Sequence, residues 1–400
     1  MGSEVLLGSL LADVEVGVAG GTQTKPPADD EWGVLRLSAM SSGRFTGEQA
    51  KRLAVQASAP QRYEVRDGDV LMVRVNGAQH LVGAARSVTR SRPGLLLSDL
   101  LFRIVPDGDR LLPGFLDLLL SSHDVRRQMR MAMRGSSGQF QLPQAAVRAL
   151  EVPNVSPDQQ RRIVAAHAAF AERVAALEGV AAKRAQLLDA LVEQLLGACA
   201  DETVSLAEAD VAIGAGITLG AHRVPHLRPA GYLRVANVRK GWIEGDVALL
   251  EAMERDHQRY ALRSGDLLVV EGHADPEQIG RCAVVGAAQV GLLYQNHLFR
   301  LRFDDMLPEF AMLWLNSRTV RSYWTAHCAT SSGLYTVNSR LLEGVPFPRV
   351  SRDEQERVVG VWKAESRAAS LLKQRIDKLR TVQQAVVEDL LTGRSKANAA

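Results

Sequence analysis

The fold is decided by a stretch that occurs twice, as Val152-Pro-Asn-Val-Ser-Pro-Asp-Gln-Gln-Arg-Arg-Ile-Val164 and again as Phe347-Pro-Arg-Val-Ser-Arg-Asp-Glu-Gln-Glu-Arg-Val-Val359. Each copy has the features of a helix start. A serine can cap the free amide groups, and the acidic residues of the first turn face the positive end of the helix dipole. The sequence therefore predicts two long helices that begin alike, at Ser156 and Ser351.

Four further matches, in the same order along both halves, show that nearly the whole chain is an internal repeat. The pairs are Tyr63–Leu71 with Tyr260–Leu268, Leu101–Ile104 with Leu298–Leu301, Ser136–Phe140 with Ser331–Tyr335, and Ala190–Gly197 with Ala385–Thr392. The period is far longer than the repeat of a solenoid, which spans about 20–50 residues. The chain is therefore predicted to hold two copies of a unit made of a globular domain followed by a helix.

The repeat divides the 400 residues into four parts. We expect globular domains over 1–155 and 201–350, and helical segments over 156–200 and 351–400.

Within each domain, short runs of apolar residues after Gly-Asp turns, Val70–Val73 and Leu267–Val270, predict strands. The segments Leu111–Met133 and Met306–Cys328 each predict one amphipathic helix, because a proline falls in the first turn.

Both long helices carry seam residues at alternating spacings of four and three, which is typical of a coiled coil. The seam runs from Ile163 to Leu195 in the first helix and from Val358 to Leu390 in the second. Each helix alone would expose its seam to water, so we expect the two to pack antiparallel. The predicted fold class is α+β, with two similar mixed α/β domains joined by an antiparallel coiled coil in a pseudo-twofold arrangement.

Four seam positions are polar. Arg184, Glu365 and Gln383 would fix the register of the helix pair, which is a known use of buried polar groups. His167 is predicted to be a packed seam residue and not a ligand.

The composition limits the classes of function. No apolar run is long enough to span a membrane, and the first twenty residues are acidic, which argues against a secretory signal. The three cysteines are too far apart for a metal knuckle or a disulfide framework. We therefore expect a cytoplasmic protein without a membrane partner. A net charge of +3 permits nucleic-acid binding but does not require it.

Two loops at matched places, 74–80 and 271–278, follow the predicted Gly-Asp strands, and we name them the strand loops. Their sequences differ sharply, although the flanking strands agree, as expected of one scaffold that presents different contact residues. Asparagine and glutamine can bind adenine through two hydrogen bonds, and arginine can bind guanine. The candidate DNA-binding residues here are Arg74, Asn76, Gln79, His80, His273 and Gln278. The alternative is that these tips are polar only because they are solvated.

A second pair of loops contains Ser-Ser-Gly, at 134–141 and 329–336, and we name them the serine loops. Arginines lead into both loops and could attract phosphate, while serine can donate a hydrogen bond to it. The candidate DNA-binding residues are Arg126, Arg127, Arg130, Arg134, Ser136, Ser137, Gln139 and Gln141 in the first copy, and Arg318, Arg321, Ser331, Ser332, Tyr335 and Asn338 in the second. The alternative is a solvated helix face that ends in a glycine cap.

No motif indicates catalysis. The chain lacks Walker A, HExxH and GxSxG patterns, and no residues form a predicted metal site. Asp69 and Asp266 match across the copies, but they sit in turns beside apolar strands. A turn role is the preferred interpretation for both.

In this order, and twice over, these motifs resemble the specificity subunit of a type I restriction–modification system. The resemblance rests on the Gly-Asp strand with its variable loop, the Leu-Phe-Arg strand, the Ser-Ser-Gly loop and the starts and ends of the long helices. It covers essentially the whole chain. It implies two target-recognition domains, each reading one half of a split target in double-stranded DNA. It also implies helices that dock two modification subunits and an assembly that recruits restriction subunits.

The resemblance further implies that the partner methyltransferase subunits bind S-adenosylmethionine and methylate adenine, while the specificity subunit has no cofactor and is not an enzyme. The charge of the domains departs from this picture. Residues 1–155 hold 18 Lys and Arg against 16 Asp and Glu, and residues 201–350 hold 15 against 17. DNA affinity must then come from local arginines or from the partners.

Three alternatives stay open at this point. The chain could be a bivalent adaptor that never contacts DNA, a specificity-like subunit of another phage-defence system, or an enzyme whose catalytic residues the sequence does not reveal.

Overall fold

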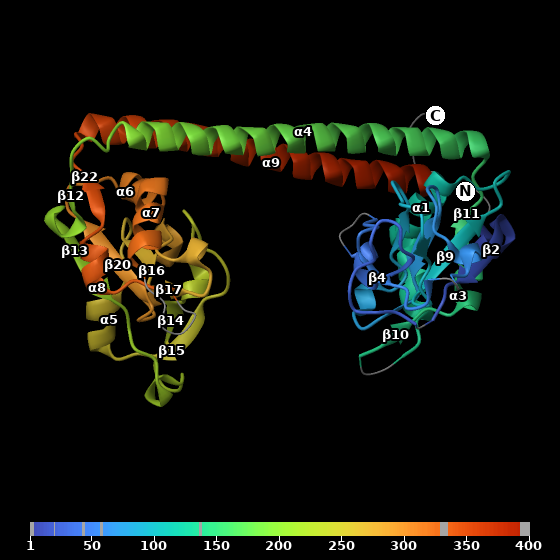
Figure 1. Cartoon of the computed structure of the whole chain (residues 1–400), viewed down its shortest axis with the longest axis horizontal. Helices are drawn as coiled ribbons and strands as arrows, with labels where there is room; N and C mark the ends of the chain where they lie inside the picture. The colour runs from blue at the N-terminus through green and yellow to red at the C-terminus, as the bar shows by residue number, and fades with distance from the viewer. Residues whose placement is uncertain are drawn as a thin grey trace. The chain divides into compact units, whose positions relative to one another are not determined.

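The computed structural model describes residues 4–19, 21–41, 45–56, 59–135, 138–328 and 335–392, and it divides into two units. Unit 1 takes the described residues of Met1–Glu178 and Gln374–Ala400, and unit 2 is Gly179–Lys373. The division falls inside both long helices, α4 (Pro157–Gly197) and α9 (Arg352–Thr392), which have 41 residues each (Figure 1). Each unit therefore holds one globule and one half of each long helix.

The globule of unit 1 is a mixed structure of short strands and helices. Its elements are β1 (Glu4–Leu6), β2 (Leu11–Val16), β3 (Gly33–Leu35), β4 (Ala50–Arg52), β5 (Val70–Val73), β6 (Val75–Asn76), β7 (Ala85–Ser87), β8 (Leu95–Leu96), β9 (Leu101–Pro106), α1 (Pro113–Ser121), α2 (His123–Ala132), β10 (Phe140–Gln141), α3 (Gln144–Arg148) and β11 (Glu151–Pro153). The main sheet has the order β2-β9-β5-β7, and the smaller sheets are β4-β3-β8, β1-β11 and β10-β6.

The globule of unit 2 repeats this topology. Its elements are β12 (Thr203–Ser205), β13 (Val211–Ala215), β14 (Pro229–Leu233), β15 (Ala248–Glu251), α5 (Glu254–Tyr260), β16 (Leu267–Val270), β17 (Gly272–His273), β18 (Cys282–Val284), β19 (Leu293–Tyr294), β20 (Leu298–Phe303), α6 (Pro308–Leu315), α7 (Arg318–His327), β21 (Tyr335–Thr336), α8 (Ser339–Glu343) and β22 (Pro346–Pro348). The sheets β13-β20-β16-β18, β15-β14-β19, β12-β22 and β17-β21 match those of unit 1 one for one. The predicted repeat and its mixed α/β class are confirmed.

One of the two inner strands of each main sheet, β5 or β16, is buried on both faces. In β5, Val70 and Met72 face the core that includes α1, while Leu71 and Val73 face the core under the three-stranded sheet. In unit 2, β16 divides its side chains in the same way. This double burial explains why both strands read as continuous apolar runs.

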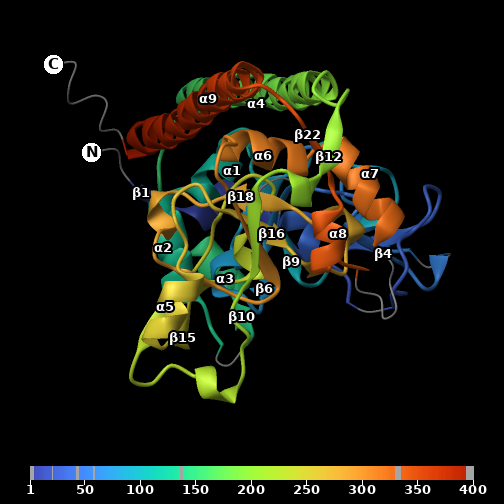
Figure 2. The same ribbon diagram turned by 90° about the vertical axis from the view of Figure 1, so that its left-hand side faces the viewer.

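The long helices close the outer layer of each unit. Val387 and Leu391 of α9 join the core of unit 1, and Val192 and Leu196 of α4 join the core of unit 2. Figure 2, which turns unit 2 toward the viewer, shows α6 between β18 and the long helices.

Within each unit the two helix halves run antiparallel, as predicted. In unit 1, Gln383 donates to the carbonyl of His167 at 3.1 Å, and Arg380 pairs with Glu178. In unit 2, Arg184 pairs with Glu365 at 2.7 Å. Three of the polar seam residues thus form contacts between the helices.

The seam itself departs from the predicted spacing near the helix ends. Leu191 is 40% exposed, whereas its neighbour Val192 is buried, and Val387 is buried more deeply than Val386. The physical reason is that these ends pack on the core of a globule as well as on the partner helix, so the buried face turns from the seam toward Val192 and Val387.

The predicted single helices over 111–133 and 306–328 are wrong, because each segment forms two helices. The break in unit 1 falls at Ser122, whose extended backbone separates α1 from α2. Glu388 of α9 accepts a hydrogen bond from the first amide of α2, that of His123, at 2.7 Å. In unit 2, Glu193 of α4 accepts from the amide of Arg318 at 3.0 Å. A carboxylate from a distant helix thus caps each new helix start.

Among the described residues, no helix combines the length and the apolar character that a membrane span requires.

Candidate nucleic-acid interface

In unit 1 the structure brings the two kinds of predicted loop together. Strand β6 carries the start of the strand loop and pairs antiparallel with β10, which ends the serine loop, with Asn76 opposite Phe140. Arg134 and Gln141 exchange two backbone hydrogen bonds of 2.9 and 2.8 Å and close the base of the serine loop. The corresponding pair in unit 2 is β17 with β21, where His273 lies opposite Tyr335.

The strand loop of unit 1 presents a neutral to basic surface. Gln79 and His80 are exposed. Asn76 is half-buried, and its side-chain carbonyl accepts from the amide of Ala78 at 2.9 Å, which shapes the turn. Arg74 is also half-buried and donates to the carbonyl of Asp99 at 2.9 Å, so its guanidinium supports the loop base.

The strand loop of unit 2 presents acidic side chains instead. Asp275 and Glu277 are exposed. The Nδ1 atom of His273 accepts from the amide of Asp275 at 3.0 Å, and Gln278 accepts from buried Arg281 at 3.1 Å. His273 and Gln278, the two candidate DNA-binding residues of this loop, therefore both help to hold its shape.

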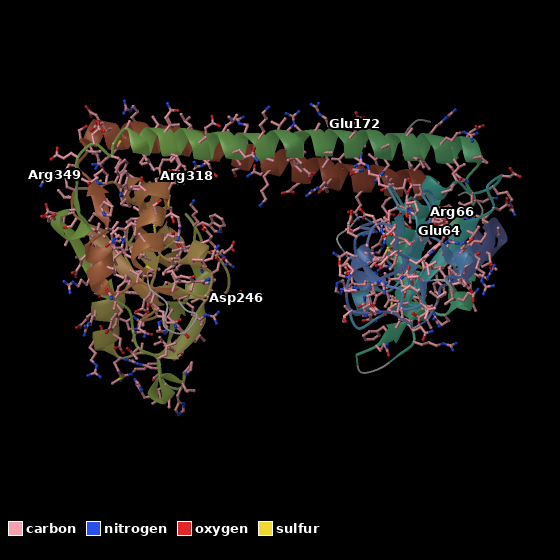
Figure 3. All side chains as sticks on the ribbon, in the orientation of Figure 1. Glu64, Arg66, Glu172, Asp246, Arg318 and Arg349 are labelled. Atoms are coloured by element: carbon pink, nitrogen blue, oxygen red, sulfur yellow. The ribbon has the colours of Figure 1, made fainter. Side chains whose placement is uncertain are left out.

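The candidate arginines fall into two groups. Arg127, Arg130, Arg134 and Arg318 are exposed, and Figure 3 shows Arg318 at the end of α7 nearest the long helix. Arg126 and Arg321 are half-buried instead, and each donates two hydrogen bonds to carbonyls of the strand-loop region. Exposed guanidiniums are suited to phosphate, whereas the half-buried pair is committed to the protein.

The serine loops are described in part. Ser136, Ser137, Ser331 and Ser332 lie outside the described residues. Gln139 is exposed, while Gln141 and Tyr335 are half-buried. Asn338 caps α8 by accepting from the amide of Leu341 at 2.9 Å.

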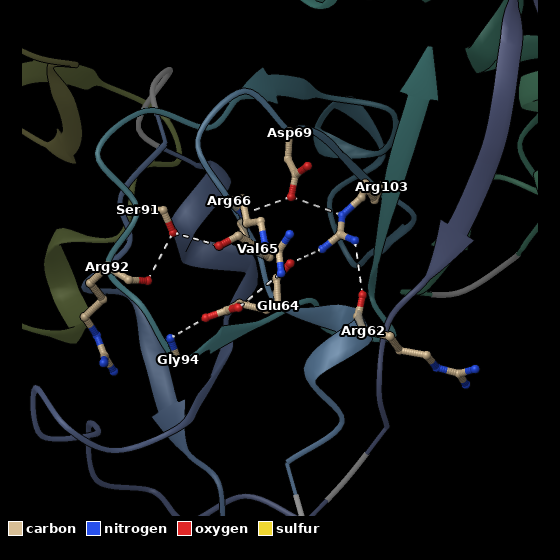
Figure 4. Close-up of polar contacts among 9 residues, drawn as sticks. All are labelled: Arg62, Glu64, Val65, Arg66, Asp69, Ser91, Arg92, Gly94 and Arg103. Carbon is tan, nitrogen blue, oxygen red and sulfur yellow. Dashed lines mark hydrogen bonds and ion pairs between the residues drawn. The ribbon is translucent and has the colours of Figure 1, made fainter. Parts of the chain in front are cut away.

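The matched aspartates of the Gly-Asp turns have structural contacts. Asp69 accepts from the amide of Arg66 at 2.9 Å and pairs with Arg103 at 3.1 Å (Figure 4). Asp266 is buried and accepts two hydrogen bonds from Arg302, at 2.6 and 2.7 Å. These are the contacts of a turn role.

No group of three or more His, Cys, Asp and Glu side chains in the described part of the chain could hold a metal ion.

Sequence reasoning missed two glutamines that join each long helix to its globule. Gln160 is buried, accepts from the amide of Leu112 at 2.8 Å and donates to the carbonyls of Arg110 and Val155, both at 2.8 Å. Gln355 accepts from the amide of Leu307 at 2.8 Å in the same way. Their signal was visible, because both stand at the same place in the repeated helix start.

The comparisons with known proteins agree with this architecture. No protein-family model matches the chain. Two curated relatives from Escherichia coli are type I restriction enzyme specificity subunits. That of EcoKI, from strain K12, is 33% identical over 104 residues, which are 25% of this chain and 22% of that protein. That of EcoEI is 29% identical over 116 residues, which are 29% of this chain and 19% of that protein. The matched region therefore spans about a fifth of each relative.

Solved structures extend the likeness along the chain. A chain from a type I restriction–modification system, studied for its complex assembly and conformational transition, superposes with a TM-score of 0.65 at 18% identity and covers 97% of both chains. This chain has the fold of a type I specificity subunit. The HsdS subunit of Thermoanaerobacter tengcongensis has a TM-score of 0.50 at 19% identity and covers 98% of this chain and 96% of that one. The resemblance of the sequence motifs to specificity subunits is thereby confirmed.

Proposed function

We propose that this chain is a non-catalytic DNA-specificity subunit of a type I restriction–modification complex. The globules within 1–155 and 201–350 act as target-recognition domains, and each reads one half of a bipartite target in double-stranded DNA. The observation that carries the proposal is the pairing of one repeated scaffold with divergent strand loops. Matched sheets and helices hold loops whose exposed side chains are Gln79 and His80 in one unit and Asp275 and Glu277 in the other.

The long helices, 156–200 and 351–400, are proposed to dock two methyltransferase subunits, which bind S-adenosylmethionine and methylate adenine. Restriction subunits join the same assembly. Support comes from the fold, which the chain shares over nearly all its length with a chain of a type I system studied for its complex assembly.

The exposed arginines around the serine loop of unit 1 are proposed to contact phosphate. Arg134→Ala should weaken DNA binding by the assembled complex by about threefold to tenfold and lower the slope of log K against log salt by about one, because one phosphate contact is lost. The measurement is a titration of labelled duplex at several salt concentrations, with the methyltransferase partner present.

Arg66→Ala is the matched control, since Arg66 is an exposed arginine of the same unit outside both loops. Equal slopes for Arg134→Ala and the unchanged complex would remove Arg134 from the interface.

Mapping methylated adenines in cells that hold the complex tests the whole proposal. A split motif is expected, and the absence of any motif, together with no gel shift, would favour the adaptor.

A further inference from the structure

Each unit contains an arginine whose guanidinium holds the strand-loop region by its backbone. Nη1 of Arg126 on α2 donates to the carbonyl of Val82 at 2.9 Å, and its Nη2 donates to that of His80 at 2.7 Å. On α7, Nη1 of Arg321 donates to the carbonyls of Ile279 at 2.6 Å and Pro276 at 3.1 Å. The two arginines stand at matched positions, 195 residues apart. One acceptor of each, Val82 or Ile279, is also matched, whereas the second acceptors, His80 and Pro276, are one position out of register.

In the part of the chain that the structure describes, no carboxylate lies at ion-pair distance from either arginine, although Glu277 and Asp275 are near enough to Arg321 to act on its charge. Burial lowers the pKa of both arginines because it desolvates the charged form. Arg130 and Arg86 add to the effect at Arg126, whereas the carboxylates of Glu277 and Asp275 oppose it at Arg321. A cation in this position is stabilised by the carbonyl oxygens it bonds, so any movement of the loop would leave it poorly solvated.

Matched glycines let the helix approach the loop closely. Gly83 has a φ of +74° and Gly280 a φ of +66°, a conformation that favours glycine. A Cβ atom at Gly83 would lie 2.8 Å from Nη1 of Arg126 and 2.6 Å from Sδ of Met129. At Gly280 a Cβ atom would clash with the Trp324 ring. The backbone of both loops is therefore fitted to the helix that carries the arginine.

The matched acceptors Val82 and Ile279 are both buried and apolar, whereas the second acceptors, which lie nearer the loop tips, differ between the units. His80 is exposed in unit 1, and Pro276 precedes exposed Glu277 in unit 2. A contact through the backbone keeps its geometry whatever side chain the loop carries. The shape of the loop can therefore stay the same while its side chains change.

We propose that Arg126 and Arg321 are positioning residues for DNA recognition, each fixing the strand loop of its own unit without contacting DNA itself. The inference rests on the proposed function, since it assumes that the strand loops read the target. Each arginine then governs the specificity of one half-site alone, because it fixes only the loop of its own unit.

The test compares Arg126→Gln, Arg126→Lys and Arg321→Gln in the full chain assembled with its methyltransferase partner. Arg66→Gln and Arg263→Gln are matched controls, because they remove the same charge from exposed arginines at corresponding turns of the two units. Hydrogen exchange of the peptides 77–83 and 274–280 reports the loops. Sequencing of methylated adenines reports the target of each half.

Arg126→Gln should speed exchange in 77–83 by about tenfold to a hundredfold, because two charge-assisted hydrogen bonds are lost. It should make one half of the methylated motif degenerate and leave the other half intact. Arg321→Gln should do the same to the other loop and the other half. Arg126→Lys keeps the charge without the fork and should fall between the original and Arg126→Gln.

Three results would overturn the inference. The first is an unchanged motif in Arg126→Gln although its loop exchanges faster. The second is equal loss of both halves, which would indicate a general structural role. The third is the absence of any bipartite motif from the original complex, which would refute the proposed function itself, whatever the exchange data show for the loops.

Discussion

The Gly-Asp turns of the two units perform the same task with different partners. Asp266 in unit 2 is buried and accepts a two-pronged bond from Arg302, whereas Asp69 in unit 1 is partly exposed and meets Arg103 through one atom at 3.1 Å. By sequence position, the counterpart of Arg103 is Arg300, and that of Arg302 is Val105. The aspartate is thus present in both copies. The arginine that pairs with it lies two positions further along the strand in unit 2 than in unit 1.

This difference shows which parts of the scaffold are interchangeable. A turn needs a carboxylate that accepts from its backbone, and any nearby cation can satisfy the remaining charge. The helix anchors Gln160 and Gln355 and the caps Glu388 and Glu193 bond backbone groups instead, and they hold matched positions. Contacts to the backbone are thus repeated closely in the two units, and contacts between side chains are not.

The largest expected effect separates the two aspartates. Asp266→Asn should destabilise unit 2 by about 3 kcal/mol, because it leaves the guanidinium of Arg302 without its buried partner. Asp69→Asn should cost unit 1 about 1 kcal/mol, since that pair is more exposed and less well aligned. Hydrogen exchange in strands β16 and β5 measures the two units separately.

Asp246→Asn, at an exposed position of unit 2, is the control for loss of a charge. Equal losses for Asp266→Asn and Asp69→Asn would show that burial of the pair does not set its contribution.

A smaller difference is expected between the helix anchors. Gln160 makes three hydrogen bonds of 2.8 Å to backbone groups, whereas Gln355 makes one of 2.8 Å and one of 3.4 Å. Gln160→Ala should therefore cost about 2 kcal/mol and Gln355→Ala about 1 kcal/mol, because buried backbone groups lose their partners. Exchange of the amides of Leu112 and Leu307, which directly precede α1 and α6, measures each loss.

Gln159→Ala is the neighbouring control, since its side chain makes no such bonds to the globule in the described structure. If it slowed or sped exchange as much as Gln160→Ala, the anchor assignment would be wrong.

The sequence predicted what depends on local physics. The apolar runs Val70–Val73 and Leu267–Val270 form β5 and β16, and α4 and α9 begin beside the predicted caps at Ser156 and Ser351. It could not predict the breaks that separate α1 from α2 and α6 from α7, because the capping carboxylates come from distant helices. For the same reason it did not separate the arginines that hold the loops from those that face solvent. The acceptors of Arg126 and Arg321 are carbonyls that only the folded loop brings near.

The seam of the helix pair provides the last comparison, because its polar layers alternate between the units. Unit 2 pairs Arg184 with Glu365, and the matched residues of unit 1 are Leu379 and Phe170. One layer along, unit 1 joins His167 and Gln383, and the matched residues of unit 2 are Trp362 and Leu188. Each unit therefore has one polar and one apolar layer, in opposite order.

This order matters because the two helices are copies and could pair with a second chain. If α4 met another α4 in the same antiparallel register, Arg184 would face Phe170 and its charge would be left without a partner.

Replacing the pair by Arg184→Leu with Glu365→Phe makes the layer apolar in both units. The free energy of unfolding should change by less than about 1 kcal/mol, because the ion pair is exposed. The fraction of dimers formed on refolding from urea at high chain concentration should rise, as light scattering would measure. Glu178→Ala with Arg380→Ala, which removes an exposed pair between the same helices, should leave that fraction low. Dimer fractions that match in both double variants would mean that the polar layers do not select the intramolecular partner.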